Sequence, residues 1–296
     1  MKITICETAG LCAGAMRAYM SVVDSLKTNK NVAVYKEILH NENLISDLKN
    51  KGAIFHDNLS ELKKDDFVIL RAHGEEKSIY EYLEKNGNRY FDSICHNVKN
   101  VRDISIKKEK EGFNIIVVGK CKNGKCHDEV LGLVSFLTNP IVVSSIDEAQ
   151  RIHFEQGKKY FAVCQTTYPA KLFEEIIETF SKNARKSKAV FEYKNTICSF
   201  TAVNNQKSKE LARVSDIAIV VGSTRSSNTI ELYESVKDIC HTVFANDIEE
   251  IIYEVKKRID AQNIPISKVK ICILAGASTL KKNLKNIQNR LVFELK

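Results

Sequence analysis

The chain has 296 residues, with 45 Lys and Arg against 37 Asp and Glu, which gives a formal net charge of +8 at pH 7. Hydrophobic residues make up 44% and charged residues 28% of the chain, a balance typical of soluble globular proteins that argues against a disordered or fibrous chain. The length suits two or three modest domains, and no apolar run approaches the ~18–20 residues of a membrane span.

Short apolar runs alternate with amphipathic stretches along the whole chain. The runs that we predict to be strands include residues 3–6, 32–35, 67–70, 115–118, 160–164, 217–221 and 269–274. The stretches that we predict to be helices include residues 13–26, 98–111, 171–182, 202–213 and 280–290. Such alternation predicts parallel α/β units with right-handed crossovers, in which ligand groups collect at the carboxyl ends of the strands.

The start of the chain turns acidic at once and has no apolar signal region, so we expect a cytoplasmic protein. The nine cysteines are an odd number, which in that location makes a disulfide framework a poor interpretation. The sequence contains no C-x-x-C pattern, which argues against zinc ribbons and thioredoxin-type pairs. Cys121 and Cys126 lie in a polar KCKNGKC loop, which is either a metal or redox clip or an exposed insertion; we favour the insertion.

The chain repeats itself at an interval of about one hundred residues. The Ser/Thr-Ile-Cys pattern that ends at Cys95 recurs at Cys198, and Val-Val-Gly at 117–119 recurs at 220–222, both at an offset of 103 residues. The first hundred residues resemble a shorter copy, with Cys12 in the equivalent place. We therefore predict three pseudo-symmetric α/β lobes with parallel sheets. They cover residues 1–97 (with the N-terminal strand), 98–199 and 200–296.

Polar residues follow the predicted strands in each copy. Downstream of the three cysteines, a helix and a strand lead to His40, His127 and Ser226, respectively. A later strand in each copy ends in a small polar turn, at residues 72–74, 165–167 and 276–278. If the three copies face a common axis, the cysteines converge there with these polar groups around them.

Three converging thiolates allow three interpretations. They could bind zinc, although a structural zinc site needs a fourth protein ligand. They could hold three irons of a cubane [4Fe–4S] cluster and leave the fourth iron open as a Lewis-acid and redox site. They could also be packing residues that duplication has repeated. The polar strand ends around them favour the cluster.

The strand ends also form a candidate anion site. Ser226, Ser227 and Asn228 lie between an apolar strand and a helical stretch, where hydroxyls, an amide and helix N-terminal N–H groups would cradle a diphosphate. The histidines that can add hydrogen-bond donors are His40, His73 and His127. Glu129 could reach the same pocket as a proton donor, or it could simply complement the dipole of a helix.

By these residues the chain resembles the 4-hydroxy-3-methylbut-2-enyl diphosphate reductase family, which catalyses the last step of the methylerythritol phosphate route to isoprenoids. The resemblance runs over essentially the whole chain and rests on nine segments in order. They are AGLCAGAMRA, ILHN, AHG, DSICHNVKNV, HDEVLG, QTT, TICSFT, VVGSTRSSN and AGAST. No segment is specific alone, but nine in order, with every coordinating member present, are strongly specific.

The resemblance implies a three-lobed fold around a central [4Fe–4S] cluster, with Cys12, Cys95 and Cys198 as its ligands. It implies an oxidoreductase in which the allylic hydroxyl of the substrate binds the open iron and is expelled as water, giving isopentenyl and dimethylallyl diphosphates. The implied substrate-binding residues are His40, His73, His127, Ser226, Ser227, Asn228 and Ser278. The implied proton donor is Glu129, helped by Thr166 and His127.

The chain departs from the family pattern beside the expected site. The family usually has proline where this chain has His96 and Asp128, a small residue at Arg71, and commonly asparagine at Arg225. None of these replaces an implied cluster ligand or substrate group, but they place extra charge close to them. The chain is therefore either a divergent member of the family or a paralogue that reduces a different substrate.

The enzyme interpretation requires an external electron donor, because no G-x-G-x-x-G follows a strand and nothing resembles a flavin site. We expect a ferredoxin or flavodoxin, docking near the lysine-rich segment 120–125. No segment combines clustered basic residues with interleaved aromatics, so we expect neither a nucleic-acid nor a membrane partner. A non-enzymatic iron–sulfur sensor is the other alternative, although a sensor needs no anion cradle.

Overall fold

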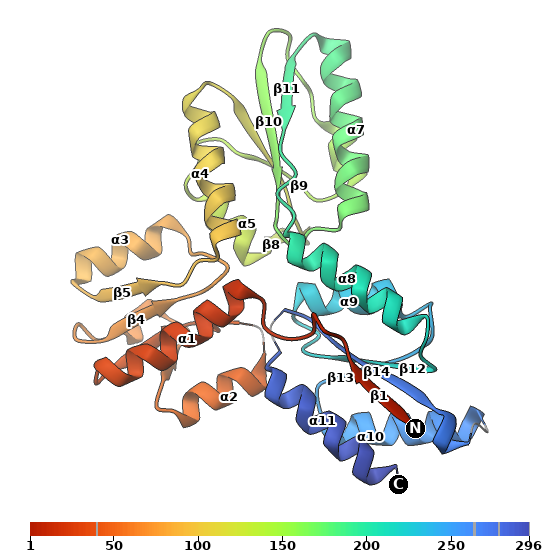
Figure 1. Cartoon of the computed structure of the whole chain (residues 1–296). Helices are drawn as coiled ribbons and strands as arrows, with labels where there is room; N and C mark the ends of the chain where they lie inside the picture. Colours follow the sequence, from red (N-terminus) through yellow and green to blue (C-terminus); the bar gives the residue numbers. More distant parts are fainter. Residues whose placement is uncertain (40, 263–264, 278, 296) are drawn as a thin grey trace. The chain divides into compact units, whose positions relative to one another are not determined.

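The computed structural model describes residues 1–39, 41–262, 265–277 and 279–295 (Figure 1). The chain divides into two compact units. The unit that contains both ends of the chain, here called the terminal unit, consists of Met1–Met16, Leu39–Asn50 and Ser199–Lys296. The other, here called the middle unit, consists of Arg17–Ile38 and Lys51–Cys198. Among the described residues, no helix is long and apolar enough to cross a membrane.

The middle unit contains two four-stranded parallel sheets, of which the first has the order β3-β2-β4-β5. Its strands are β2 (Val32–Tyr35), β3 (Ile54–His56), β4 (Phe67–Leu70) and β5 (Arg89–Asp92). The helices of this part of the chain are α1 (Ala13–Thr28), α2 (Glu42–Asn50), η1 (Leu59–Glu61) and α3 (Lys77–Asn86). Of these, α2 belongs to the terminal unit, and α1 begins there and ends in the middle unit.

The second sheet of the middle unit has the order β11-β10-β6-β9. Its strands are β6 (Asn114–Val118), β9 (Ile141–Val143), β10 (Lys159–Cys164) and β11 (Val190–Tyr193). Its helices are α4 (His96–Lys110), α5 (Asp128–Val134), α6 (Ile146–Arg151) and α7 (Ala170–Ser187). A short antiparallel hairpin lies between β6 and α5 and consists of β7 (Cys121–Lys122) and β8 (Lys125–Cys126).

The alternating side chains of β6 build a core on both faces of the second sheet. Ile115 and Val117 pack in one cluster with apolar residues of α4 and α5, and Ile116 and Val118 pack in another with apolar residues of α7. Figure 1 accordingly shows α4 and α7 on opposite sides of this sheet. A strand that is buried on both faces is apolar throughout, which explains why its sequence alone predicts it.

The terminal unit contains the third four-stranded parallel sheet, ordered β1-β14-β12-β13. Its strands are β1 (Lys2–Ile5), β12 (Ile217–Val221), β13 (His241–Ala245) and β14 (Lys270–Ala275). The helices of this part of the chain are α8 (Ser199–Ala212), α9 (Ser227–Val236), α10 (Ile248–Gln262), η2 (Ile266–Lys268) and α11 (Lys281–Glu294). These parallel sheets confirm the predicted α/β class.

The three four-stranded parallel sheets share one strand order. With the strands of each sheet numbered along the chain, the two sheets of the middle unit follow the order 2-1-3-4, and the third sheet follows it with β1 in the fourth place. The fourth place of the third sheet is taken by the N-terminal strand, which pairs with β14 and has Lys2 opposite Lys270. The N-terminal strand therefore lies in the third sheet and not, as the sequence predicts, in the first lobe. The predicted lobe boundaries at 97/98 and 199/200 stay predictions.

Candidate functional site

The three repeated cysteines have the same backbone setting. In each copy the cysteine N–H donates to the carbonyl of the second residue after a central strand, which is β4, β10 or β14. The pairs are Cys95 with Ala72 (2.9 Å), Cys198 with Thr166 (2.8 Å) and Cys12 with Ala277 (3.2 Å). This shared hydrogen bond confirms the in-register repeat at the level of the backbone. It also ties each cysteine to the strand-end turn where the sequence places polar groups.

Each of these cysteines stands directly before the first residue of a helix, α1, α4 or α8. Their thiols are half-buried, whereas Cys6, Cys164 and Cys272 are buried. The N–H groups of a helix N-terminus stabilise a thiolate, and the N–H of Ala15 lies 3.4 Å from Cys12 Sγ. The three cysteines are therefore accessible at helix N-termini, unlike those that only fill the core.

Cys95 and Cys198 share one environment in the middle unit. The side-chain amide of Asn97 on α4 donates to Cys198 Sγ at 3.2 Å. Burial raises the pKa of Cys95, the N–H groups of Asn97 and Val98 oppose this, and charge on Cys198 raises it further. Two thiolates that repel each other are a donor set that a cationic metal centre stabilises.

Cys12 lies in the terminal unit. Within the described ranges, no group of three or more His, Cys, Asp or Glu side chains is gathered in a way that could hold a metal ion. The convergence of all three cysteines therefore stays a prediction.

Glu129 is a buried carboxyl group held by one residue. The N–H of Thr166 donates to Glu129 Oε1 at 2.6 Å, and the Thr166 hydroxyl donates to Oε2 at 3.0 Å. The side chain of Glu129 lies at a small cavity lined mainly by valine and leucine. Burial raises the pKa of Glu129 to about 7, although the Thr166 hydrogen bonds and the charge of Lys120 oppose the shift. Near neutral pH this carboxyl group is thus poised between its two protonation states.

Two histidines meet beside Glu129. His127 caps the N-terminus of α5, where its Nδ1 accepts from the Glu129 N–H at 3.2 Å, so the proton of the neutral ring lies on Nε2. The rings of His73 and His127 pack edge to face, with centroids 5.7 Å apart and an interplanar angle of 82°. The turn after β4 and the start of α5 therefore bring two imidazoles together, and one of them, His127, contacts the backbone of Glu129.

The candidate anion cradle lies in the terminal unit, at the start of α9. Ser226 is the N-cap residue, is buried, and makes no capping hydrogen bond with its side chain. Asn228 accepts from the Thr201 hydroxyl of α8 at 3.3 Å, which orients its amide. A ten-residue helix whose cap hydroxyl is not used for capping can offer that hydroxyl and its first N–H groups to an anion.

Two glycines let α9 approach the ends of β12 and β14 closely. A Cβ at Gly276 would lie 2.6 Å from Thr229 Oγ1 and 3.2 Å from the Thr229 backbone, and a Cβ at Gly222 would lie 2.9 Å from the same oxygen. Thr229 Oγ1 is buried and has no hydrogen-bond partner among the described residues. The cradle thus depends on backbone contacts that only glycine permits.

Gly276→Ala is expected to destabilise the protein by about 1–3 kcal/mol, because the added methyl group must displace the first turn of α9. Thermal unfolding measures the loss, and substrate KM should rise because the displaced turn carries Ser226. Gly132→Ala is the matched control, since its Cβ would meet no atom closer than 3.4 Å. Equal melting temperatures for Gly276→Ala and the unmodified protein would contradict the close approach.

The residues predicted from the sequence fall into two groups. The middle unit holds Cys95, Cys198, His73, His127, Glu129 and Thr166. The terminal unit holds Cys12, Ser226, Ser227 and Asn228. His40, Ser278 and the side chain of Ser227 lie outside the described part of the chain. Within the middle unit, the rings of His73 and His127 are in contact and the Glu129 carboxyl group is bonded to Thr166. A common pocket for these residues and the anion cradle stays a prediction.

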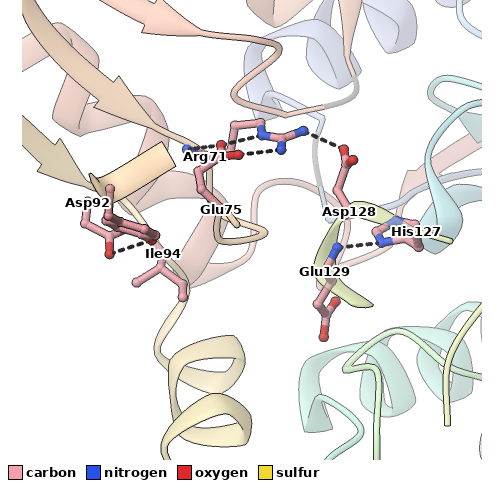
Figure 2. Close-up of polar contacts among 8 residues, drawn as sticks. Arg71, Glu75, Asp92, Ile94, His127, Asp128 and Glu129 are labelled. Atoms are coloured by element: carbon pink, nitrogen blue, oxygen red, sulfur yellow. Dashed lines mark hydrogen bonds and ion pairs between the residues drawn. The ribbon is translucent and has the colours of Figure 1, made fainter. Parts of the chain in front are cut away.

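Glu75 is a residue of this region that no sequence motif predicted. Arg71 and Asp128, noted only as departures near the site, contact each other directly, and Glu75 holds Arg71 from the other side (Figure 2). The spacing of four residues between Arg71 and Glu75 is a weak signal for such a pair in a sequence. The other two departures do not join this group: His96 opens α4, and Arg225 contacts Glu42 at 3.3 Å in the terminal unit.

The structure corrects the interpretation of the KCKNGKC loop. Cys121 and Cys126 form a disulfide that closes the β7–β8 hairpin, whose tip residues Asn123 and Gly124 have positive φ. The tip is exposed, as an insertion should be, but the two cysteines are half-buried and bonded. Asn-Gly is the strongest short signal for a tight hairpin, and it brings the flanking cysteines opposite each other.

The chain matches known proteins over nearly its whole length. The LytB protein family model matches residues 3–292. A protein of Caldanaerobacter subterraneus subsp. tengcongensis named 4-hydroxy-3-methylbut-2-enyl diphosphate reductase is 34% identical over 285 residues, which are 94% of this chain and 92% of that protein.

Two solved structures are similar as well. The E-1-hydroxy-2-methyl-but-2-enyl-4-diphosphate reductase from Plasmodium falciparum aligns with a TM-score of 0.82 and 27% identity, over 98% of this chain and 88% of that one. An (E)-4-hydroxy-3-methyl-but-2-enyl diphosphate reductase, described as the terminal enzyme of the non-mevalonate pathway, aligns with a TM-score of 0.72 and 30% identity, over 99% and 100%. The chain therefore belongs to the LytB family, as its motifs predict.

Proposed function

We propose that the chain is an oxidoreductase that converts 4-hydroxy-3-methylbut-2-enyl diphosphate, the compound for which its relatives are named, to isopentenyl and dimethylallyl diphosphates. The position of Thr166 carries the proposal. Its N–H and hydroxyl hold Glu129, and its carbonyl accepts the N–H of Cys198. One residue thus joins the candidate proton donor to a candidate cluster ligand.

The reaction removes a hydroxyl group: the C–O bond breaks, a C–H bond forms, and water leaves after the uptake of two electrons and two protons. Glu129 is the residue that we assign to proton delivery, because a carboxyl group with a pKa of about 7 is partly protonated near neutral pH. Thr166 fixes both carboxyl oxygens, and His127 lies beside it with its ring orientation set by the Glu129 N–H.

Cys12, Cys95 and Cys198 would hold a [4Fe–4S] cluster through three thiolates, and the cluster would supply the electrons. Their half-burial, their places before helices and the mutual repulsion of Cys95 and Cys198 suit such a group. Ser226, with the first turn of α9, would bind the diphosphate, while Asn228, held by Thr201, would orient it. His73 and His127 would add donors to the same anion.

The source of electrons is a separate part of the proposal. We assign the role to a ferredoxin or flavodoxin that docks on the β7–β8 hairpin, where Lys122 and Lys125 are exposed. Lys122→Glu with Lys125→Glu should slow reduction by such a donor roughly tenfold or more, because acidic donors are steered by basic patches. Turnover with a small artificial donor should not change. Lys182→Glu, an exposed lysine on α7, is the control, and an unaltered rate with the protein donor would refute this docking site.

Anaerobic turnover of 4-hydroxy-3-methylbut-2-enyl diphosphate tests the whole proposal. The reconstituted protein is supplied with an artificial one-electron donor, and the diphosphate products are separated and quantified. Both products are expected. A protein with a full cluster that leaves the substrate unreacted would instead be a paralogue acting on another compound. Failure to bind any diphosphate, together with a cluster-dependent protein partner, would identify a sensor.

A further inference from the structure

Arg71 is a buried cation with two acidic partners. Arg71 directly follows β4. Its guanidinium donates two hydrogen bonds to the Glu75 carboxylate, from Nε to Oε1 and from Nη2 to Oε2, each at 2.6 Å. The third nitrogen of the guanidinium, Nη1, donates to Asp128 Oδ2 at 2.5 Å (Figure 2). The side chains of Arg71 and Glu75 are 6% and 1% exposed, whereas that of Asp128 is 31% exposed.

The network joins two segments that carry site residues. Arg71 and His73 lie two residues apart in the turn after β4, which is a strand of the first sheet. Asp128 lies between His127 and Glu129 at the start of α5, beside the second sheet. The edge contact of the two histidine rings spans the same junction.

Arginine suits this junction for a geometric reason. Its planar fork satisfies a bidentate carboxylate and still presents a third N–H direction, which the single ammonium of lysine cannot do in a fixed geometry. Burial lowers the pKa of Arg71, but hydrogen bonds and charge from Glu75 and Asp128 outweigh burial and raise it. The guanidinium therefore stays charged, and Glu75 neutralises it so that Asp128 can be held without an isolated buried charge.

We propose that Arg71, clamped by Glu75, is a positioning residue that holds Asp128 and so fixes His127 and Glu129 against the His73 turn. This proposal rests on the proposed function for its kinetic part only. A misplacement of about 1 Å in a catalytic group can reduce the rate roughly 100-fold. Loss of the Arg71–Asp128 contact should therefore lower kcat more than it raises KM.

The kinetic test is a double-mutant cycle on the reconstituted holoenzyme. Asp128→Ala is expected to lower kcat by 10-fold to 100-fold with little change in cluster content or melting temperature, since Asp128 is partly exposed. Asp128→Asn, whose amide oxygen can still accept from Nη1, should recover most of that loss. The double variant Arg71→Lys/Asp128→Ala should be no slower than Arg71→Lys alone, because each substitution removes the same Arg71–Asp128 contact. Glu192→Gln, which breaks the Lys108–Glu192 ion pair in the same unit, is the control.

A second readout does not depend on the reaction. Hydrogen–deuterium exchange of the segment 127–134 should accelerate in Asp128→Ala and not in Glu192→Gln, whatever compound the protein reduces. Unchanged exchange and unchanged kcat in Asp128→Ala would overturn the proposal, and so would strict additivity in the cycle. The proposal would also be overturned if kcat fell only in proportion to the loss of folded protein and Asp128→Asn did not restore it. The network would then have a purely structural role. Accelerated exchange in Asp128→Ala, together with a wild-type protein that leaves the diphosphate unreacted, would support the positioning role and refute the proposed function.

Discussion

Glu129→Gln should lower kcat by roughly 10²–10⁴-fold while the protein keeps its fold and its cluster. Glutamine retains the shape of the protonated carboxyl group, and its amide oxygen can still accept from the Thr166 N–H. It has no acidic proton to deliver to a leaving hydroxyl, and proton transfer by a positioned acid contributes about this factor. Steady-state anaerobic kinetics measure the change, with iron content as the check on the cluster.

Glu148→Gln is the matched control for this variant. Glu148 accepts from the N–H and the hydroxyl of Ser144, as Glu129 does from Thr166, but it lies exposed in α6. It should turn over at the wild-type rate. If Glu129→Gln did so as well, proton delivery would belong to another group.

The pH dependence of the wild-type protein follows from the same residue. A general acid must be protonated, so kcat should fall as the pH rises through about 7, and Glu129→Gln should lose this limb. The folded-state pKa of about 7 lies above the ordinary value of 4.5, so the native state binds more protons than the unfolded chain between these values. The free energy of unfolding therefore decreases as the pH rises from 4.5 to 7. Relative to Glu129→Gln, the wild type should lose roughly 3 kcal/mol across this range, which denaturant titrations at several pH values can measure.

Cys198→Ser should abolish turnover by preventing assembly of a complete cluster. Serine is nearly isosteric with cysteine, but its hydroxyl is a hard, weakly acidic ligand that does not replace a thiolate on iron. The Asn97 amide donates to Cys198 Sγ at 3.2 Å and holds the side chain of this residue in place. Iron and sulfide content, together with the electron paramagnetic resonance of the reduced protein, report on the cluster directly.

Cys240→Ser is the control that distinguishes the loss of a cluster ligand from the loss of any partly buried cysteine. Cys240 is also free and only partly buried, but it follows α9 and stands far along the chain from the repeated positions. It should keep both the cluster and the activity. A full, unaltered cluster in Cys198→Ser would show that this thiol is not a ligand.

The central strands of each sheet could be predicted because burial on both faces makes them continuously apolar. Residues 32–35, 67–70 and 217–221 match β2, β4 and β12 to the residue. Of the strands in the three four-stranded sheets, those absent from the prediction are β3, β5, β9, β11 and β13, all at sheet edges. An edge strand such as β5 has alternating exposed and half-buried side chains, and four residues are too few to establish that period.

The histidines and acids of the middle unit could be predicted because the carboxyl ends of parallel strands are where polar residues gather. Glu129 shows the limit of that reasoning. Its position after His127 is visible in the sequence, but its proton affinity depends on burial and on two hydrogen bonds from Thr166, which lies 37 residues away. Only folding brings those groups together.

The family, the α/β class, the threefold repeat and the residue types at each strand end could all be predicted without the structure, because they follow from local periodicity and from motifs in order. Which of those residues touch depends on the folded chain. The tertiary structure moved the N-terminal strand to the third sheet, paired Cys121 with Cys126, and joined Arg71 to Asp128 across 57 residues. Such contacts depend on the packing of elements far apart in the chain, and that packing leaves no local pattern in the sequence.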